Sequence, residues 1–174
     1  MITPGWVRAM AAYNTEMNRR LYAAADGLHD ATRHADGGAF FGSIHGTLCH
    51  LVWGDTAWMS RFDGWEKPPA GISGSPSWIG DWATLKSTRA AMDERLEAWA
   101  GRLSEVDLAG ELTWFSGATG REMTRPRWLL VTHMFNHQTH HRGQAHALIT
   151  RAGAKTADTD LPWAVPESLW AAPS

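Results

Sequence analysis

The sequence predicts an all-α fold, a four-helix bundle with long crossover loops. Four long segments carry apolar side chains at intervals of three and four residues, which places these side chains on one face of a helix. The connections after the second and third segments are long enough to run the length of a bundle. The chain has 174 residues, a length typical of one domain. We therefore expect a single helical domain spanning residues 1–174.

The first and last predicted helices have recognisable ends. The first spans residues 3–28, with Thr3 as the N-cap and Pro4 at the first helical position. The last spans residues 126–152, with proline at its start and Gly153 just beyond its end. These signals, together with the apolar periodicity, predict helices at both ends of the bundle sequence.

The two middle helices are predicted over residues 42–63 and 77–103. Ser43 is a candidate cap for the first of them. Gly46 and Gly54 lie inside it and each cost about 1 kcal/mol of helix propensity relative to alanine, so we interpret them as sites of close helix approach. In the second, a set of charged residues is expected to form a solvated face: Lys86, Arg89, Asp93, Glu94 and Glu97.

The connections and the tail carry weaker signals. Residues 64–76 are rich in proline and glycine, which indicates a loop. Residues 112–115 and 121–124 alternate around a glycine-containing turn, which predicts a short hairpin. The C-terminal tail, with Pro162, Pro166 and Pro173, is expected to be irregular and to pack on the body of the domain.

Composition excludes several classes of protein. The net charge of −2 gives no basic excess, so we expect no nucleic-acid partner. No apolar run is long enough to span a membrane, and the first twenty or so residues lack the apolar core of a signal peptide. Cys49 is the only cysteine, which excludes an intrachain disulfide; we expect a cytoplasmic protein. The eleven tryptophans suggest a core built from large aromatic side chains.

Histidines gather in the last predicted helix. Five of the nine lie within a short stretch: His133, His137, His140, His141 and His146. His137 and His141 are four residues apart and differ by about 40° around the helix, so they share one face. Such a pair can hold a metal ion, and catalytic sites typically add a third protein ligand. The second helix offers His45 and His50, between which spacing alone does not choose; a hydrogen-bonded core histidine is the alternative for His50.

Polar residues around this pair are candidates for supporting roles. His133, His140 and Gln144 are placed to orient ligands or substrate. Arg142 is a candidate for binding an anionic substrate, with a surface salt bridge or an interface as the alternative. For Asp55 we favour a structural role, as a cap or as the partner of an arginine.

Other side chains near the candidate ligands are interpreted as structural. Cys49 is expected to be a buried, unreactive thiol. Trp53, Trp58 and Trp128 are interpreted as core residues, with the walls of an apolar pocket as the alternative.

Four segments in order resemble the DinB-like family, also called the DinB/YfiT superfamily. The run NHQTHHRGQ at residues 136–144 is similar to its most recognisable motif. Residues 40–62 carry an H-L-x-x-x-D-x-x-W pattern that begins at His50. MAAYNTEMNRRLY at residues 10–22 resembles the opening helix of the family, and TDLPWAVPE at residues 159–167 resembles its closing segment.

The resemblance implies a four-helix bundle that holds a divalent metal ion through three histidines. Carried over by position, the ligands are His50, His137 and His141. Neutral imidazoles suit zinc, nickel, iron and copper alike; Zn, Ni or Fe are the ions we expect. Relatives in the family are often homodimers, so we expect a homodimer, and some relatives use low-molecular-weight thiols as cosubstrates.

These observations predict a divalent-metal-binding protein with a small-molecule substrate. We expect a metal-dependent enzyme of the thiol S-transferase or hydrolase type, whose catalytic residues beyond the metal ligands are unassigned. The alternative is a non-catalytic, metal-binding stress-response bundle. A fourth protein ligand would favour the alternative, whereas an open position on the metal would favour an enzyme.

Overall fold

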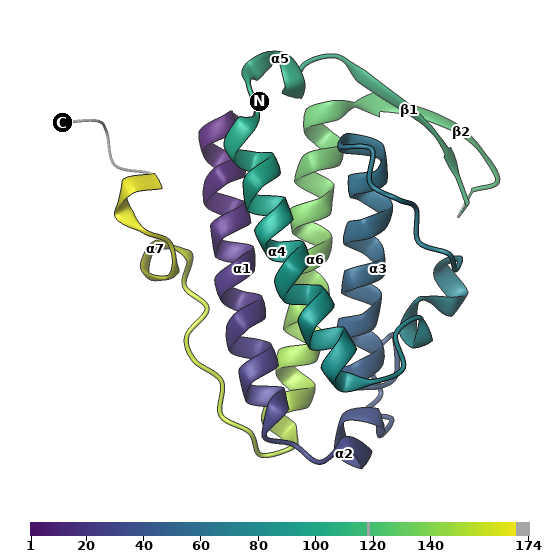
Figure 1. Cartoon of the computed structure of the whole chain (residues 1–174), viewed down its shortest axis with the longest axis vertical. Helices are drawn as coiled ribbons and strands as arrows, with labels where there is room; N and C mark the ends of the chain where they lie inside the picture. Colours follow the sequence, from purple (N-terminus) through teal and green to yellow (C-terminus); the bar gives the residue numbers. More distant parts are fainter. Residues whose placement is uncertain (118, 170–174) are drawn as a thin grey trace.

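Four long helices form the body of the protein in a computed structural model that describes residues 1–117 and 119–169. They are α1 (Pro4–Asp26), α3 (Ile44–Phe62), α4 (Trp82–Arg102) and α6 (Arg127–Arg151) (Figure 1). The all-α bundle predicted from the sequence is confirmed, since the described residues add only one two-stranded sheet to these helices.

Short elements occupy the connections and the tail. The helical ones are α2 (Asp30–His34), η1 (Ile72–Ser77), α5 (Glu105–Leu108), α7 (Leu161–Ala164) and η2 (Glu167–Leu169). Strands β1 (Glu111–Ser116) and β2 (Arg121–Pro126) pair antiparallel, with Thr113 opposite Thr124. The predicted hairpin is therefore confirmed and is longer than the alternation indicated.

Side-chain caps fix the starts of three long helices. Thr3 Oγ1 accepts a hydrogen bond from the Trp6 backbone N–H at 3.1 Å, and Ser43 caps α3 in the same way, as predicted. The expected start of the third long helix at residue 77 is wrong, because residues 72–77 form the 3₁₀ helix η1. Helix α4 begins at Trp82, after the Asp81 carboxylate, which accepts from the Thr84 N–H at 2.8 Å.

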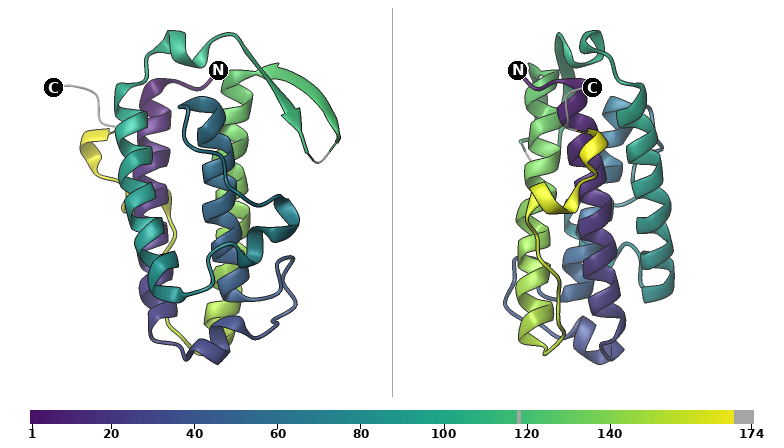
Figure 2. Two further views of the ribbon diagram at one scale, coloured as in Figure 1. Left: turned by 45° about the vertical axis from the view of Figure 1, so that its right-hand side comes forward. Right: turned by 90° about the vertical axis from the view of Figure 1, so that its left-hand side faces the viewer.

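Helices α3 and α4 run parallel, and α1 and α6 run in the opposite direction (Figures 1 and 2). Contacts at both ends show the parallel pair: His45 near the start of α3 bonds to Ile79 just before α4, and Arg102 at the end of α4 pairs with Asp63 just after α3. Residues 63–81 are thus a crossover that returns the length of the bundle, as predicted. The second long connection does not cross; it carries α5 and the hairpin instead.

The core is mainly aliphatic. Its largest fully buried side chains include Leu48, Leu51, Met59, Leu85, Leu96, Met134, Phe135 and Ile149. The expected tryptophan core is wrong, because only Trp65 and Trp99 are buried among the described tryptophans. An indole N–H needs a hydrogen-bond partner, which keeps most of the rings at the border of the core; Trp53, for example, donates to the Ala70 carbonyl. None of the described helices is long and apolar enough to cross a membrane.

The C-terminal tail packs along α1, as predicted. The Tyr13 hydroxyl donates to the Thr159 carbonyl at 2.6 Å, and Arg20 donates to the Asp158 carbonyl at 2.6 Å. Val165 is buried in a small cluster with Tyr13 and Met17 of α1. Pro173 lies outside the described residues.

A buried guanidinium joins α3 to α4. Arg89 Nη1 donates to Asp55 Oδ2 at 2.6 Å, and its Nη2 lies 2.7 Å from Asp93 Oδ1. All three residues are buried, so the expectation that Arg89 and Asp93 lie on a solvated face is wrong. The reason is the Asp55 carboxylate on the facing helix, since a buried charge needs an opposite charge beside it. The pKa of Arg89 is raised, because Asp93 and Asp55 outweigh the effect of burial.

Hydrogen bonds extend this pair to the other two helices. Asp93 accepts from Asn18 Nδ2 of α1 at 2.9 Å. Asp55 Oδ1 accepts from Gln138 Nε2 of α6 at 2.6 Å. We call this set, Asn18, Asp93, Arg89, Asp55 and Gln138, the buried polar chain; it links all four long helices.

Asp55→Asn should lower the free energy of unfolding by about 3 kcal/mol, because it removes one partner of a buried charge pair. Asp26→Asn is the matched control: its ion pair with Lys86 is about half exposed, and its loss should cost less than about 1 kcal/mol. Urea unfolding measures both variants. Equal losses of unfolding free energy in the two variants would contradict a large stabilising contribution from the buried polar chain.

Candidate metal centre

Three imidazoles converge between α3 and α6. His50 of α3 and His137 and His141 of α6 each offer a nitrogen atom within 4.8 Å of the others. The Nε2 atoms of His50 and His137 are 3.0 Å apart. Within residues 1–117 and 119–169 this is the one group of three or more potential metal-ligating side chains so arranged.

Hydrogen bonds set the tautomers of two of these rings. Ser75 Oγ donates its hydrogen to the Ile72 carbonyl at 2.7 Å, so it accepts from His50 Nδ1–H at 2.8 Å. Gln144 Oε1 accepts from His141 Nδ1–H at 2.8 Å. Each of these two rings therefore has an Nε2 lone pair left for another partner, as in metal sites where a neighbouring group orients the ligand.

His137 completes the group, and its hydrogen bonding shows whether the three rings fit a metal ion. Its Nδ1 is buried without a hydrogen-bond partner among the described residues, and its Nε2 faces the lone pair of His50. With His50 protonated at Nδ1, either tautomer of His137 leaves a buried nitrogen lone pair without a donor, which is costly. A divalent cation accepts such lone pairs, so the donor set fits one.

The electrostatic surroundings keep the rings neutral. Burial lowers the pKa of His50 to about 3, with further lowering by His137 and His141. Burial also lowers the pKa of His137 to about 3, and that of His141 is lowered for the same reason. Neutral imidazole is the form that binds a metal ion, so these side chains are ready to bind at neutral pH.

Gly54 lets α3 and α6 approach at the site. A Cβ atom on Gly54 would lie 2.9 Å from His137 Cε1, which confirms the predicted close helix approach. Gly46 differs from the prediction: a Cβ atom there would lie 2.5 Å from the Phe41 carbonyl oxygen and 3.3 Å from Pro76 Cβ, so the segment before α3 and the short helix η1 approach it rather than a long helix.

Comparison with known protein families gives one match. The sequence matches the DinB family over residues 1–168. The chain belongs to the DinB family. No curated protein and no solved structure matches it significantly.

The residues around the three histidines of this DinB family protein fall into two groups. Gln144 bonds His141, and its Nε2 lies 3.3 Å from His140 Nε2. The His133 ring lies 5.9 Å from that of His137 and edge-on to the Trp58 ring at 5.2 Å. By contrast, His45 bonds the Ile79 carbonyl at 2.7 Å and stacks on His34, outside the cluster.

Arg142 does not face the three histidines. Its guanidinium is buried between α1 and α6, where it bonds Asn14 and, at 3.1 Å, Gln138. Burial lowers its pKa to about 10. The surface salt bridge, one of the alternatives given for Arg142, is therefore wrong, since the side chain is buried and no described carboxylate pairs with it.

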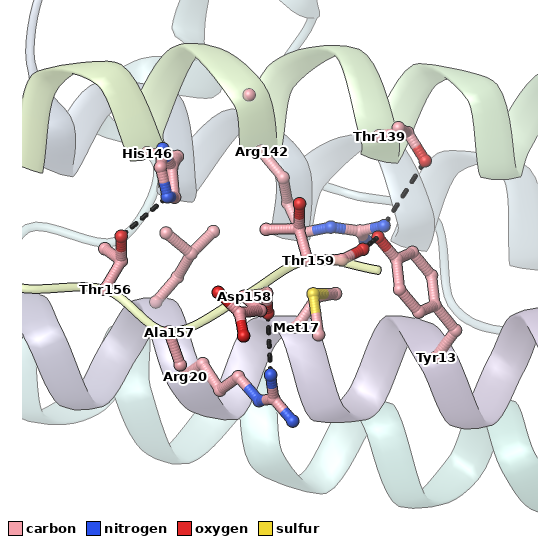
Figure 3. Close-up of a pocket in the computed structure, with 12 residues that line it drawn as sticks. Tyr13, Met17, Arg20, Thr139, Arg142, His146, Thr156, Ala157, Asp158 and Thr159 are labelled. Atoms are coloured by element: carbon pink, nitrogen blue, oxygen red, sulfur yellow. Dashed lines mark hydrogen bonds between the residues drawn. The ribbon is translucent and has the colours of Figure 1, made fainter. Parts of the chain in front are cut away.

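A separate cavity of about 200 Å³ lies beside Arg142, between α1, α6 and residues 156–159 (Figure 3). His146 lines this cavity and bonds Thr156 Oγ1 at 2.6 Å. The cavity is smaller than most ligand pockets, which run from about 300 to 1,000 Å³.

Two structural expectations are confirmed. Asp55 pairs with an arginine, and Cys49 is fully buried, where burial raises the pKa of its thiol. Two contacts of His50 were not predicted: the hydrogen bond to Ser75, and the ring of Phe41, which stacks on that of His50 with centroids 3.6 Å apart. Ser75 belongs to the short 3₁₀ helix η1 and Phe41 to a turn, and α-helical periodicity gives no signal in either segment.

Gly54→Ala should destabilise the protein by about 1–3 kcal/mol, because the added methyl group displaces the His137 ring from a packed site. Gly101→Ala on α4 is the control. No atom lies within 4 Å of a Cβ there, so that variant should gain up to about 1 kcal/mol. Thermal and urea unfolding report both effects; a Gly54→Ala protein as stable as wild type would refute the close contact.

For protein stripped of metal by a chelator, the free energy of unfolding should fall as the pH drops from 6.5 toward 3. In this range the unfolded chain protonates His50 and His137, whereas the folded chain holds them neutral, so protons favour unfolding. Urea unfolding between pH values of about 7.5 and 5 measures the slope. His137→Gln should give a shallower slope, and identical slopes would contradict the assignment.

Proposed function

We propose that the chain binds one divalent metal ion through His50, His137 and His141 and uses it in a reaction on a small molecule. The observation that carries the proposal is the convergence of imidazole nitrogens from two helices, with the Nε2 atoms of His50 and His137 3.0 Å apart. Two of the rings have their other nitrogen bonded to Ser75 or Gln144. Membership of the DinB family supports the same conclusion.

An open coordination sphere favours a catalytic ion over a structural one. Among the described residues no fourth histidine, cysteine or carboxylate joins the cluster. Structural sites are typically closed by four protein ligands, whereas catalytic sites use three and leave a position for water or substrate. When bound, such an ion polarises a carbonyl group or lowers the pKa of a water or thiol beside it. Zn, Ni and Fe all suit imidazole ligands.

Thiol transfer is the reaction class we favour. The described part of the cluster contains no carboxylate to serve as a general base. A thiol, with a pKa of about 8.5, loses its proton far more readily than water and so depends less on such a base. As the sulfur attacks an electrophilic substrate and the leaving group departs, the thiol proton passes to water at the exposed side of the cluster, where His140 lies beside His141.

One observation favours hydrolysis as a second candidate. Burial lowers the pKa of His133, so its imidazole is neutral at pH 7 and can accept a proton from an attacking water. Its ring lies 5.9 Å from that of His137, at the edge of the cluster.

His137→Ala should reduce bound metal from about one ion per chain to a small fraction, because it removes one of three ligands. His146→Ala is the matched control: it lies on the same helix and bonds Thr156 rather than the cluster. Elemental analysis measures the metal, and circular dichroism should show unchanged helix content in both variants. Metal retained by His137→Ala would overturn the ligand assignment.

Activity separates the classes of function. Metal-loaded protein should consume an electrophile such as an alkyl halide only when a low-molecular-weight thiol is present. Turnover of an activated ester without thiol would select the hydrolase instead. Metal binding with neither activity would favour the non-catalytic bundle.

A further inference from the structure

A cleft of about 510 Å³ lies between α3 and the β1–β2 hairpin. The hairpin and the connection that follows α3 both lie on the α3 side of the bundle (Figures 1 and 2). Trp53, Trp114 and Phe115 supply aromatic walls, and Arg61 and Lys67 lie at its border. Its volume is within the range of sites that bind small molecules.

The cleft adjoins the three-histidine cluster through shared aromatic rings. Trp53 stacks on His50 with ring centroids 5.7 Å apart, and it also lines the cleft. A second series of contacts runs from His133 to Trp58 at 5.2 Å and from Trp58 to Trp114 at 5.8 Å. A ligand in the cleft therefore lies against the rings that border the histidines.

Side chains along one face of α3 also link the three-histidine cluster to the cleft. His50, Ala57 and Arg61 recur at helical spacing, and Ala57 and Arg61 each lie within about 20° of His50 around the axis. The rise of 1.5 Å per residue separates His50 from Arg61 by about 16 Å along the helix. Arg61 thus lies about three helical turns beyond His50, which suits an elongated molecule with its anionic group at Arg61 and its other end toward the cluster.

The charge of the cleft has one sign. Of the described residues that line it, two are cationic and none is acidic. Neither Arg61 nor Lys67 forms an ion pair with a described carboxylate. The Arg61 guanidinium lies over the Trp58 ring, 4.5 Å from its centroid, which holds it in place while leaving its N–H groups free for an anion. Burial lowers the pKa of Arg61, an unfavourable setting that an anion would relieve.

We infer that this cleft binds the substrate of the metal centre, and that the substrate joins an aromatic or apolar body to an anionic group such as a carboxylate or sulfonate. Arg61 and Lys67 bind the anionic end, and Trp53 and Trp114 contact the body. The reacting end then points along α3 toward the three histidines. This inference rests on the proposed metal-dependent function, which it extends by naming the chemical class of substrate.

The test uses 1-anilinonaphthalene-8-sulfonate, an aromatic anion whose fluorescence rises on binding, and N-phenyl-1-naphthylamine, which has the same rings without the sulfonate. The wild-type protein should bind the sulfonate at one site. Arg61→Gln combined with Lys67→Gln should weaken the sulfonate at least tenfold and the neutral amine less than twofold. Arg95→Gln is the matched control, because Arg95 also stacks on a tryptophan, Trp65, outside the cleft.

Unchanged sulfonate affinity in the double variant, or an equal loss in Arg95→Gln, would overturn the inference. An equal loss for the neutral amine would do the same, because it would mean that shape and not charge had changed. The titration is repeated on chelator-treated protein, where the sulfonate should still bind. A chain that binds no metal refutes the proposed function. A double variant that does not weaken the sulfonate more than the neutral amine refutes only the substrate class.

Discussion

The buried guanidinium of Arg89 is the interaction on which the arrangement of the helices depends. Asp93 pairs with it from the same helix, whereas Asp55 reaches it only when α3 and α4 lie side by side. Asp55 in turn accepts from Gln138 of α6. This bond fixes the register of α3 against α6 next to the contact between Gly54 and His137. One helical turn away in the same antiparallel register, His50 meets His141. The geometry of the metal centre follows from the position of a buried charge outside it.

Helix α6 contributes both to the candidate metal centre and to the buried polar contacts, because two pairs of residues interleave along it. His137 and His141 form one pair at a spacing of four, and Gln138 and Arg142 form the other, rotated by about 100°. Gln138 donates to Asp55 through Nε2 and accepts from Arg142 through Oε1, so its amide joins a buried anion to a buried cation. Burial makes both charges costly, and this shared amide is one reason that they are tolerated together.

Much of this could be predicted from the sequence, and the exceptions have physical reasons. Apolar periodicity gives the long helices, and the spacing of His137 and His141 gives two of the three candidate ligands. The choice between His45 and His50 was beyond periodicity, because both lie in the same apolar stretch. The choice depends on the connection between α3 and α4, in which the Ile79 carbonyl bonds the ring of His45 and Ser75 orients that of His50. Arg89 falls on the apolar stripe of its helix, between Leu85 and Met92, but its charge favoured a solvated face. The sequence does not show that a carboxylate on another helix lies beside it.

The same contacts bear on why three imidazoles are gathered here. A structural metal ion stabilises a fold by joining elements that do not otherwise hold together. Helices α3 and α6 are already joined, by the Asp55–Gln138 bond and by core side chains such as Leu48, Met134 and Phe135. The three histidines themselves are a cost to this packing, because burial strongly lowers the pKa of His50 and His137 and leaves His137 Nδ1 without a described partner. Because other contacts already join α3 to α6, this cost supports the proposed catalytic role of the ion over a role as a structural cross-link.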